Sequence, residues 1–154
     1  MRYLICLGML LALGCSSRVD SESQVIVEER WPDGAVLKQL EVHASGATVK
    51  RWFHANGNPD RLEQYDDEGR RTGKWGAWHP NGNPWSEHHY FQGIQVEAYR
   101  TWHANGNPFI VGEYNENGEP IGRWQFFGPD GALIKEMSGA EVAAGQAGGQ
   151  SNPH

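Results

Sequence analysis

The sequence predicts an all-β fold, an elongated, single-layer antiparallel meander of about five β-hairpin repeats with a disordered C-terminal tail. The segment Trp78–Pro84 (WHPNGNP) returns as WHANGNP and FHANGNP, and the weaker copies RWPDGA and FGPDGA lie on either side. The turn glycines of the five copies are separated by 23, 25, 24 and 25 residues: Gly34, Gly57, Gly82, Gly106 and Gly131. A fixed period of this size is typical of repeat architectures.

Residues 1–14 are predicted to be a lipoprotein signal peptide. Arg2 supplies a positive flank, and Tyr3–Leu13 is an uncharged apolar run that is too short to cross a bilayer as a helix. The run ends in Leu-Ala-Leu-Gly-Cys15, which resembles a bacterial lipobox, where cleavage precedes a cysteine that is then lipid-modified. The alternatives are an ordinary signal peptide cut elsewhere and a buried N-terminal strand.

The cysteines agree with export and a lipid anchor on Cys15. Cys6 would leave with the signal peptide, so the mature chain would keep no free thiol. By resemblance to Gram-negative lipoproteins, Ser16 favours the outer membrane, whereas in a Gram-positive host the anchor would be the plasma membrane. The expected location is therefore the cell envelope.

Composition divides the rest of the chain into three parts. Residues 15–24 are polar and are predicted to be a tether, and residues 139–154 are Gly- and Ala-rich and are predicted to be a disordered tail. Residues 25–138 form one domain of ordinary size. The formal charge is −6 and no basic cluster occurs, which argues against nucleic acid as a partner.

Each unit is predicted to be a strand, a tight turn, a strand and a second turn. Asn-Gly between short runs of aromatic and β-branched residues indicates a two-residue type I′ turn. The prolines two residues after three of the turn glycines mark strand starts. The second turns end at glycines in step with the first set, namely Gly46, Gly69, Gly93 and Gly118. No segment has the apolar spacing of an amphipathic helix, so no helix is expected between residues 25 and 138.

A two-residue turn at Asn81-Gly82 would fix the strand register. The expected pairs are Trp78–Trp85, Trp75–His88, Gly73–Tyr90, Trp102–Phe109, Thr101–Ile110, Phe127–Ile134 and Trp124–Met137. Alternation then places two aromatic ridges on opposite faces: Phe53, Trp78, Trp85, Trp102, Phe109 and Phe127 on one, and Trp75, Tyr90, Tyr99, Tyr114 and Trp124 on the other. A bulged three-residue loop would instead move one strand of each pair to the opposite face.

The repeat resembles the bacterial variant MORN repeat, which occurs in chains labelled YwqK-family antitoxins. The residues that carry the resemblance are Gly73-Lys74-Trp75-x-x-Trp78-x-x-Asn81-Gly82 with Tyr90-x-x-Gly93, and Gly122-Arg123-Trp124-x-x-Phe127-x-x-Asp130-Gly131. It covers roughly Val25–Met137, and unit two departs from it with Lys50 where an aromatic is expected. The resemblance implies a single-layer antiparallel sheet and a role in protein or membrane-surface interaction.

The residues indicate no catalytic, cofactor or metal site. His54, His79 and His103 occupy one slot in three units, but equivalent strands two apart are separated by about 9.5 Å, which is too far to share a zinc ion. His88 and His89 point to opposite faces of a strand. The acidic residues are scattered, and no cleft is evident that could hold the carboxylate pair of a glycosidase. We therefore expect a non-enzyme without a cofactor.

The leading functional hypothesis is an envelope-anchored module that binds an unknown envelope protein or the membrane surface. The candidate binding residues are Trp78, Trp85, Trp102, Phe109, Trp75, Tyr90, Tyr99, Tyr114 and Trp124, although these rings could equally serve only to stabilise the sheet. A cell-wall glycan is the second candidate partner, because the Gly-Trp pairs and aromatic ladders resemble choline-binding repeats. A third hypothesis is an antitoxin or immunity protein, which export would restrict to a toxin that acts in the envelope.

Overall fold

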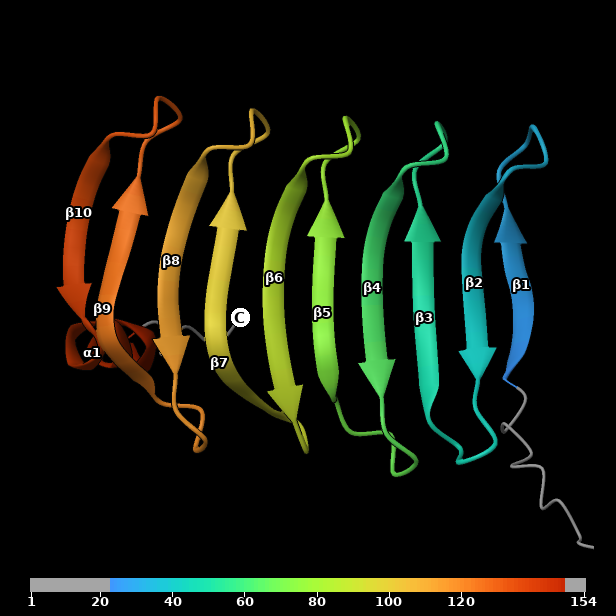
Figure 1. The fold of residues 1–154 in the computed structure, drawn as a ribbon, viewed down its shortest axis with the longest axis horizontal. Helices are drawn as coiled ribbons and strands as arrows, with labels where there is room; N and C mark the ends of the chain where they lie inside the picture. Colours follow the sequence, from blue (N-terminus) through green and yellow to red (C-terminus); the bar gives the residue numbers. More distant parts are fainter. Residues whose placement is uncertain (1–22, 149–154) are drawn as a thin grey trace, which may run out of the picture.

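The computed structural model describes residues 23–148, and it confirms the all-β meander. Ten antiparallel strands form one open sheet in sequence order (Figure 1). The strands are β1 (Gln24–Arg30), β2 (Val36–Val42), β3 (Thr48–Phe53), β4 (Pro59–Tyr65), β5 (Gly73–Trp78), β6 (Pro84–Phe91), β7 (Ile94–Trp102), β8 (Pro108–Tyr114), β9 (Pro120–Phe127) and β10 (Leu133–Ser138), followed by the helix α1 (Gly139–Gly148). The predicted signal peptide, Cys15 and residues 149–154 lie outside the described residues.

The turns of the repeats gather at two opposite edges of the sheet. The loops that join β1 to β2, β3 to β4, β5 to β6, β7 to β8 and β9 to β10 all lie along the upper edge in Figure 1. We call this the Asn-Gly edge, because its three central loops are the Asn-Gly-Asn-Pro segments. The second turns of the units lie along the lower edge, so each unit is one hairpin.

The prediction of a two-residue turn at Asn-Gly is wrong. Gly82 N–H donates to the His79 carbonyl at 2.8 Å, and His79 N–H donates to the Asn83 carbonyl at 2.9 Å. Only Gly82 takes a positive φ, of 88°, so the loop is a type I turn followed by a left-handed glycine. The reason is local: Asn81 Oδ1 accepts the Asn83 N–H at 3.0 Å, which holds the asparagine at a negative φ.

The longer loop is compensated by a bulge one residue into the next strand. Trp78 faces Pro84 and Ala77 faces Ser86, so Trp85 is the extra, bulged residue. The expected pairs Trp78–Trp85, Trp102–Phe109 and Phe127–Ile134 are therefore wrong, since the partners are Pro84, Pro108 and Leu133. Beyond the bulge, the register change caused by the longer loop is cancelled by the extra bulged residue. Four expected pairs are therefore confirmed: Trp75–His88, Gly73–Tyr90, Thr101–Ile110 and Trp124–Met137.

A type I′ turn does occur, but at the lower edge between β6 and β7. Gln92 and Gly93 both have positive φ, of 49° and 87°, and Phe91 pairs with Ile94 across the two-residue loop. The register of this pair shifts again between Glu87 and His89, where Glu97 of β7 has a φ of 61°. The extra residues of β7 at this bulge compensate for the shorter turn, so this unit keeps the same repeat length as the others.

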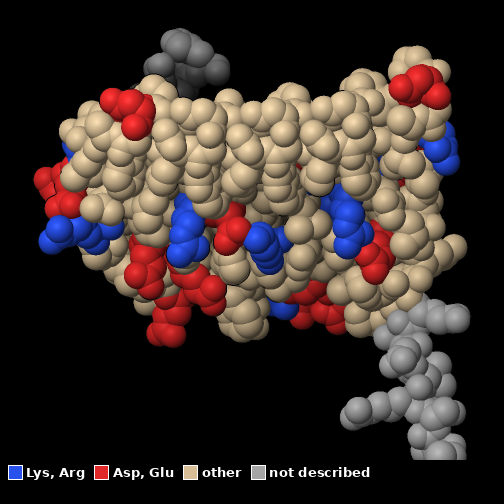
Figure 2. Space-filling model, turned by 45° about the horizontal axis from the view of Figure 1, so that its top comes forward, with Lys and Arg blue, Asp and Glu red and all other residues tan. Residues whose placement is uncertain are grey.

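The two faces of the sheet differ in chemistry. On one, which we call the aromatic face, the rings of Trp75 and Tyr90 lie 5.2 Å apart, and those of Tyr99 and Trp124 lie 5.3 Å apart. The other, the charged face, carries ion pairs such as Lys74–Glu87 at 2.6 Å. Acidic and basic groups alternate on the face turned to the viewer in Figure 2. Within residues 23–148, Trp124 is the only large hydrophobic residue that is buried, at 3% exposed.

The helix α1 is a difference from the sequence-based expectation, since Gly139–Gly148 were predicted to be disordered. Ser138 and Glu141 form a reciprocal capping box: Ser138 N–H donates to Glu141 Oε2 at 2.7 Å, and Glu141 N–H donates to Ser138 Oγ at 3.3 Å. The backbone N–H and the hydroxyl of Ser138 both donate to the Glu141 carboxylate, and these two hydrogen bonds lower the pKa of Glu141. The helix packs against the lower part of β9 (Figure 1), and Gln146 Nε2 lies 3.3 Å from Tyr114 Oη. It therefore covers one end of the aromatic face.

Candidate functional site

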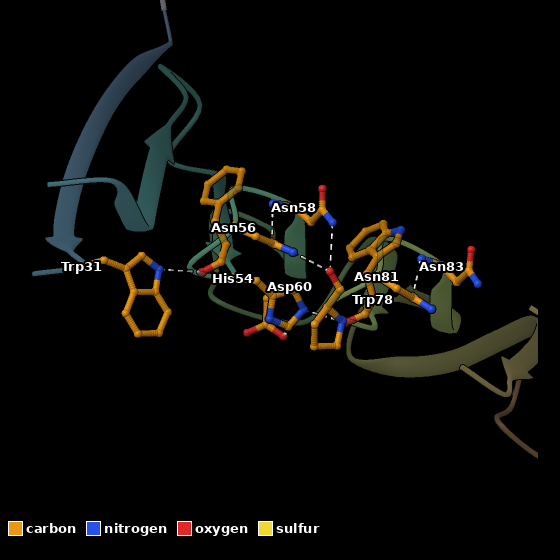
Figure 3. Close-up of polar contacts among 10 residues, drawn as sticks. Trp31, His54, Asn56, Asn58, Asp60, Trp78, Asn81 and Asn83 are labelled. Atoms are coloured by element: carbon orange, nitrogen blue, oxygen red, sulfur yellow. Dashed lines mark hydrogen bonds and ion pairs between the residues drawn. The ribbon is translucent and has the colours of Figure 1, made fainter. Parts of the chain in front are cut away.

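The repeated histidines form hydrogen bonds between neighbouring units of the sheet. His54 Nε2 lies 2.9 Å from the Trp78 carbonyl oxygen (Figure 3). His79 and His103 repeat the contact with the carbonyl oxygens of Trp102 and Phe127, at 3.2 and 3.0 Å. In the first unit Trp31 fills the slot and donates Nε1–H to the Phe53 carbonyl at 3.1 Å. A ring N–H at this position therefore donates to a backbone carbonyl of the next unit. Among residues 23–148, no cluster of three or more metal-ligating side chains is found.

The asparagines of the Asn-Gly edge form a second set of cross-unit bonds. Asn56 and Asn58 both donate Nδ2–H to the Pro80 carbonyl, at 2.7 and 2.9 Å (Figure 3). The bonds recur from Asn81 and Asn83 to Ala104, and from Asn105 and Asn107 to Pro129. Each of the three central turns is therefore held to the next turn by two amide donors on one carbonyl, which makes this part of the edge a regular ladder.

The bulge position carries an exposed apolar side chain in the last three units. Trp85 is 55% exposed, Phe109 41% and Ile134 72%, and we call these three residues the bulge row. The ring of Trp85 lies 6.3 Å from that of His79, and the ring of Phe109 lies 4.8 Å from that of His103. In the first two units the same position holds Leu37 and Asp60.

The Asn-Gly edge is uncharged at the three central loops, two of which adjoin Trp85 and Phe109. Its three central loops contain only His, Ala, Pro, Asn and Gly. Figure 2 shows this edge as an uncharged band with acidic side chains at its two ends, and the first and last loops hold Asp33 and Asp130 in the sequence. A neutral surface with regularly spaced apolar groups is therefore presented to solvent.

The remaining candidate residues lie elsewhere and do not join this row. Trp75, Tyr90, Tyr99, Tyr114 and Trp124 form the aromatic face, where contacts run from Tyr65 to Trp124. Trp78 is half-buried over Gly76, where a Cβ would lie 2.9 Å from its ring, and Trp102 takes the equivalent position in the next unit. The nine predicted binding residues thus divide between separate surfaces.

Cations on the aromatic face were missed by the sequence analysis. The Arg71 guanidinium lies 4.9 Å from the Trp75 ring and 5.3 Å from the Tyr90 ring, and Lys50 Nζ lies 4.9 Å from the Tyr65 ring. Lys50 is the residue at which unit two departs from the repeat pattern, so this departure places a cation over a ring. The signal was present in the register, since Lys50 faces Glu63, and Tyr65 lies two residues further along β4 on the same face.

Burial changes the titration of two rings that lie 4.9 Å apart on the aromatic face. It lowers the pKa of His88 and raises the pKa of Tyr99. His88 Nδ1 lies 3.3 Å from Gln95 Nε2, which can donate to it only while Nδ1 is unprotonated. On the opposite face, a hydrogen bond from Lys74 lowers the pKa of Glu87. Burial thus favours the neutral forms of His88 and Tyr99, and the Lys74 hydrogen bond favours the charged form of Glu87.

Residues 71–92 match the MORN repeat variant family, over β5, the Asn-Gly loop and β6. This supports a protein of the MORN repeat type, and such repeats are generally associated with protein or membrane interaction. The comparison with curated proteins finds no match. No helix in the described part of the chain has the length and apolar character needed to cross a membrane.

Proposed function

We propose that this protein is a non-catalytic interaction module, tethered to the cell envelope by a lipid on Cys15, which docks a partner protein on its aromatic face. The observation that carries the proposal is the single-layer sheet. The described chain has ten strands and one helix, so α1 is the only element available to cover the rings, and it packs at one end. An apolar sheet face is ordinarily buried by a second layer. A partner would supply that layer here.

The chemistry of the uncovered face suits a protein partner. Trp75, Tyr90 and Tyr99 remain half-buried with part of each ring accessible. Tyrosine and tryptophan are enriched in protein interfaces because they combine a large apolar area with a polar group. Half-buried rings already held by their neighbours would lose little conformational entropy on docking.

Charge on this face favours an acidic partner surface. Lys50 and Arg71 have no salt bridge among the described residues, although the chain as a whole is acidic. Their charges lie over aromatic rings, where a partner carboxylate could pair with them while its apolar neighbours pack on the rings. Such complementarity governs association rate and specificity.

The tether would keep this face close to the membrane. Eight residues lie between Cys15 and Gln24, where β1 begins, and a fully extended chain of nine residue steps spans at most roughly 30 Å. A lipid on Cys15 would therefore limit the domain to partners at the envelope surface. Lipid attachment is tested by incorporation of labelled palmitate. Cys15→Ala should abolish this incorporation, and the variant should no longer be recovered in the membrane fraction.

The docking proposal is tested by affinity capture from envelope membranes with the lipidated protein. Arg71→Gln and Lys50→Gln should each lower the recovery of a specific partner by about tenfold, because each removes a charge pair at the interface. Arg100→Gln is the matched control, since it neutralises a cation on the charged face. Equal recovery by all three variants, with unchanged melting temperatures, would reject the aromatic face as the docking surface.

A further inference from the structure

The bulge row repeats an aromatic platform at a fixed interval. Trp85 and Phe109 occupy equivalent positions in β6 and β8, which are two strands apart in the sheet. Strand spacing places equivalent residues about 9.5 Å apart. Each ring lies beside a histidine ring and is roughly half exposed, so part of its surface is open to a ligand.

Hydrogen-bond acceptors accompany each platform. The ladder uses the Nδ2–H groups of Asn83 and Asn107, and their Oδ1 atoms accept no hydrogen bond from the described residues. Figure 3 shows the oxygens of Asn58 and Asn83 directed away from the neighbouring turn. His79 donates through Nε2, so its Nδ1 is also an acceptor. Around Trp85 and Phe109 the edge therefore presents acceptors for hydroxyl groups and no charged side chain in its loops.

We propose that the Asn-Gly edge binds an uncharged β-1,4-linked glycan strand, with sugar rings stacked on Trp85 and Phe109. In such a chain every second sugar presents the same apolar ring face. The length of one disaccharide is close to the spacing of Trp85 and Phe109, so sugars of the same orientation would meet both rings. The hydroxyl groups between stacked sugars would donate to the asparagine oxygens. The absence of charge along the three central loops fits a neutral ligand. This site is independent of the protein-docking face.

Calorimetric titration of the full-length protein with oligomers of β-1,4-linked N-acetylglucosamine tests the proposal. The tetrasaccharide should bind at least about tenfold more tightly than the disaccharide, because only the longer ligand spans both rings. Trp85→Ala and Phe109→Ala should each weaken tetrasaccharide binding by about tenfold. Phe91→Ala is the matched control, since Phe91 is 62% exposed at the opposite edge, and it should leave binding unchanged.

A gain-of-binding variant separates the site from any loss of folding. Ile134 holds the same position in the last unit, so Ile134→Trp should add a third platform, tightening the hexasaccharide and leaving the tetrasaccharide unchanged. The proposal is overturned if no oligomer binds saturably, if an α-1,4-linked hexasaccharide binds equally well, or if Phe91→Ala weakens binding as much as Trp85→Ala.

The two proposed binding sites can be tested independently of each other. Arg71→Gln should reduce protein capture without changing glycan binding, and Trp85→Ala should do the reverse. If Trp85→Ala abolished protein capture while no glycan bound, the bulge row would belong to a protein interface and the glycan site would be rejected.

Discussion

His54 Nε2 lies 2.9 Å from the carbonyl oxygen of Trp78, 24 residues further along the chain. The same relation is met by two other histidines and, in the first unit, by the indole of Trp31. Two different ring types therefore perform one task, which is to donate an N–H across the gap between units. The task depends on the donor and the flat ring, rather than on any property special to histidine.

Substitution at His79 tests this equivalence. His79→Phe keeps a flat ring but loses the donor, and should lower the free energy of unfolding by about 1 kcal/mol because the Trp102 carbonyl loses its partner. His79→Trp provides a ring N–H, as Trp31 does in the first unit, so its free energy of unfolding should be closer to that of the parent protein. Urea unfolding of both variants checks the prediction, and equal losses would contradict it.

Asn81→Asp tests the amide ladder with almost no change in shape. The carboxylate can still accept the Asn83 N–H, but it cannot donate to the Ala104 carbonyl. We expect a loss of about 1 kcal/mol in the free energy of unfolding. Asp67→Asn is a control in a turn of the opposite edge, where Asp67 makes no such cross-unit bond, and it should have little effect. Thermal melts measure both.

Gly112 allows the Trp124 ring to lie flat on the sheet. A Cβ at this glycine would lie 2.3 Å from the indole, so Gly112→Ala must displace the ring and should destabilise the domain by about 1–3 kcal/mol. Gly145→Ala is the matched control, because it meets no atom within 4 Å and lies in α1, where alanine is favoured by up to about 1 kcal/mol. Gly112→Ala should lower the melting temperature and Gly145→Ala should raise it. An unchanged melting temperature for Gly112→Ala would contradict the packing of Trp124 on Gly112.

Ser138→Ala should release the N-terminus of α1. The substitution removes the oxygen that accepts the Glu141 N–H, and loss of such a cap costs about 1 kcal/mol. Amide hydrogen exchange should accelerate within Gly139–Gly148 while the strands β5 and β6 stay protected. Faster exchange across the whole sheet would show instead that α1 is required for the fold.

Stability should fall as the pH drops below about 6.5, through His88. Burial lowers the pKa of His88 in the folded state, so the unfolded chain takes up the proton first. The contribution of neutral His88 is therefore complete above the unfolded pKa and declines as the pH falls towards the folded pKa. Glu87 is different: its lowered pKa makes a contribution that is lost only at more acidic pH.

The measurement is the slope of unfolding free energy against pH between about 7.5 and 5, obtained from urea titrations. His88→Gln removes the titrating ring, so the slope should become shallower than that of the parent even if the variant is less stable throughout. An unchanged slope would assign the acid sensitivity to other groups.

The sequence predicts the strands and their faces well because both depend on local chemistry. Glycines in step mark the turns, and alternation assigns Trp75 and Tyr90 to one face. The turn type depends on side-chain hydrogen bonds that the Asn-Gly pair alone does not indicate: Asn81 is held locally by the Asn83 N–H and also by Ala104 of the next unit, so the tendency of Asn-Gly towards a type I′ turn is overridden. The bulge at Trp85 follows from that loop and was missed with it.

The candidate site was predicted only in part for the same reason. Trp85 and Phe109 were selected as binding residues, but as cross-strand partners of Trp78 and Trp102, whereas the bulges leave both exposed. The helix α1 was missed because its Gly- and Ala-rich sequence lacks an apolar stripe. Its capping box, Ser138-Gly-Ala-Glu141, was the readable signal.

The amide ladder has a direction, and Asp130 ends it. Every donor points from one unit to the next towards the C-terminus, yet the last unit, like the first, carries a carboxylate in place of the amide, and it carries Gly128 where the other units carry a ring. This unit accepts bonds and offers none. A second copy placed beside β10 would therefore receive no amide or ring donor from the last turn, and only the backbone groups at the open edge of β10 could pair with it.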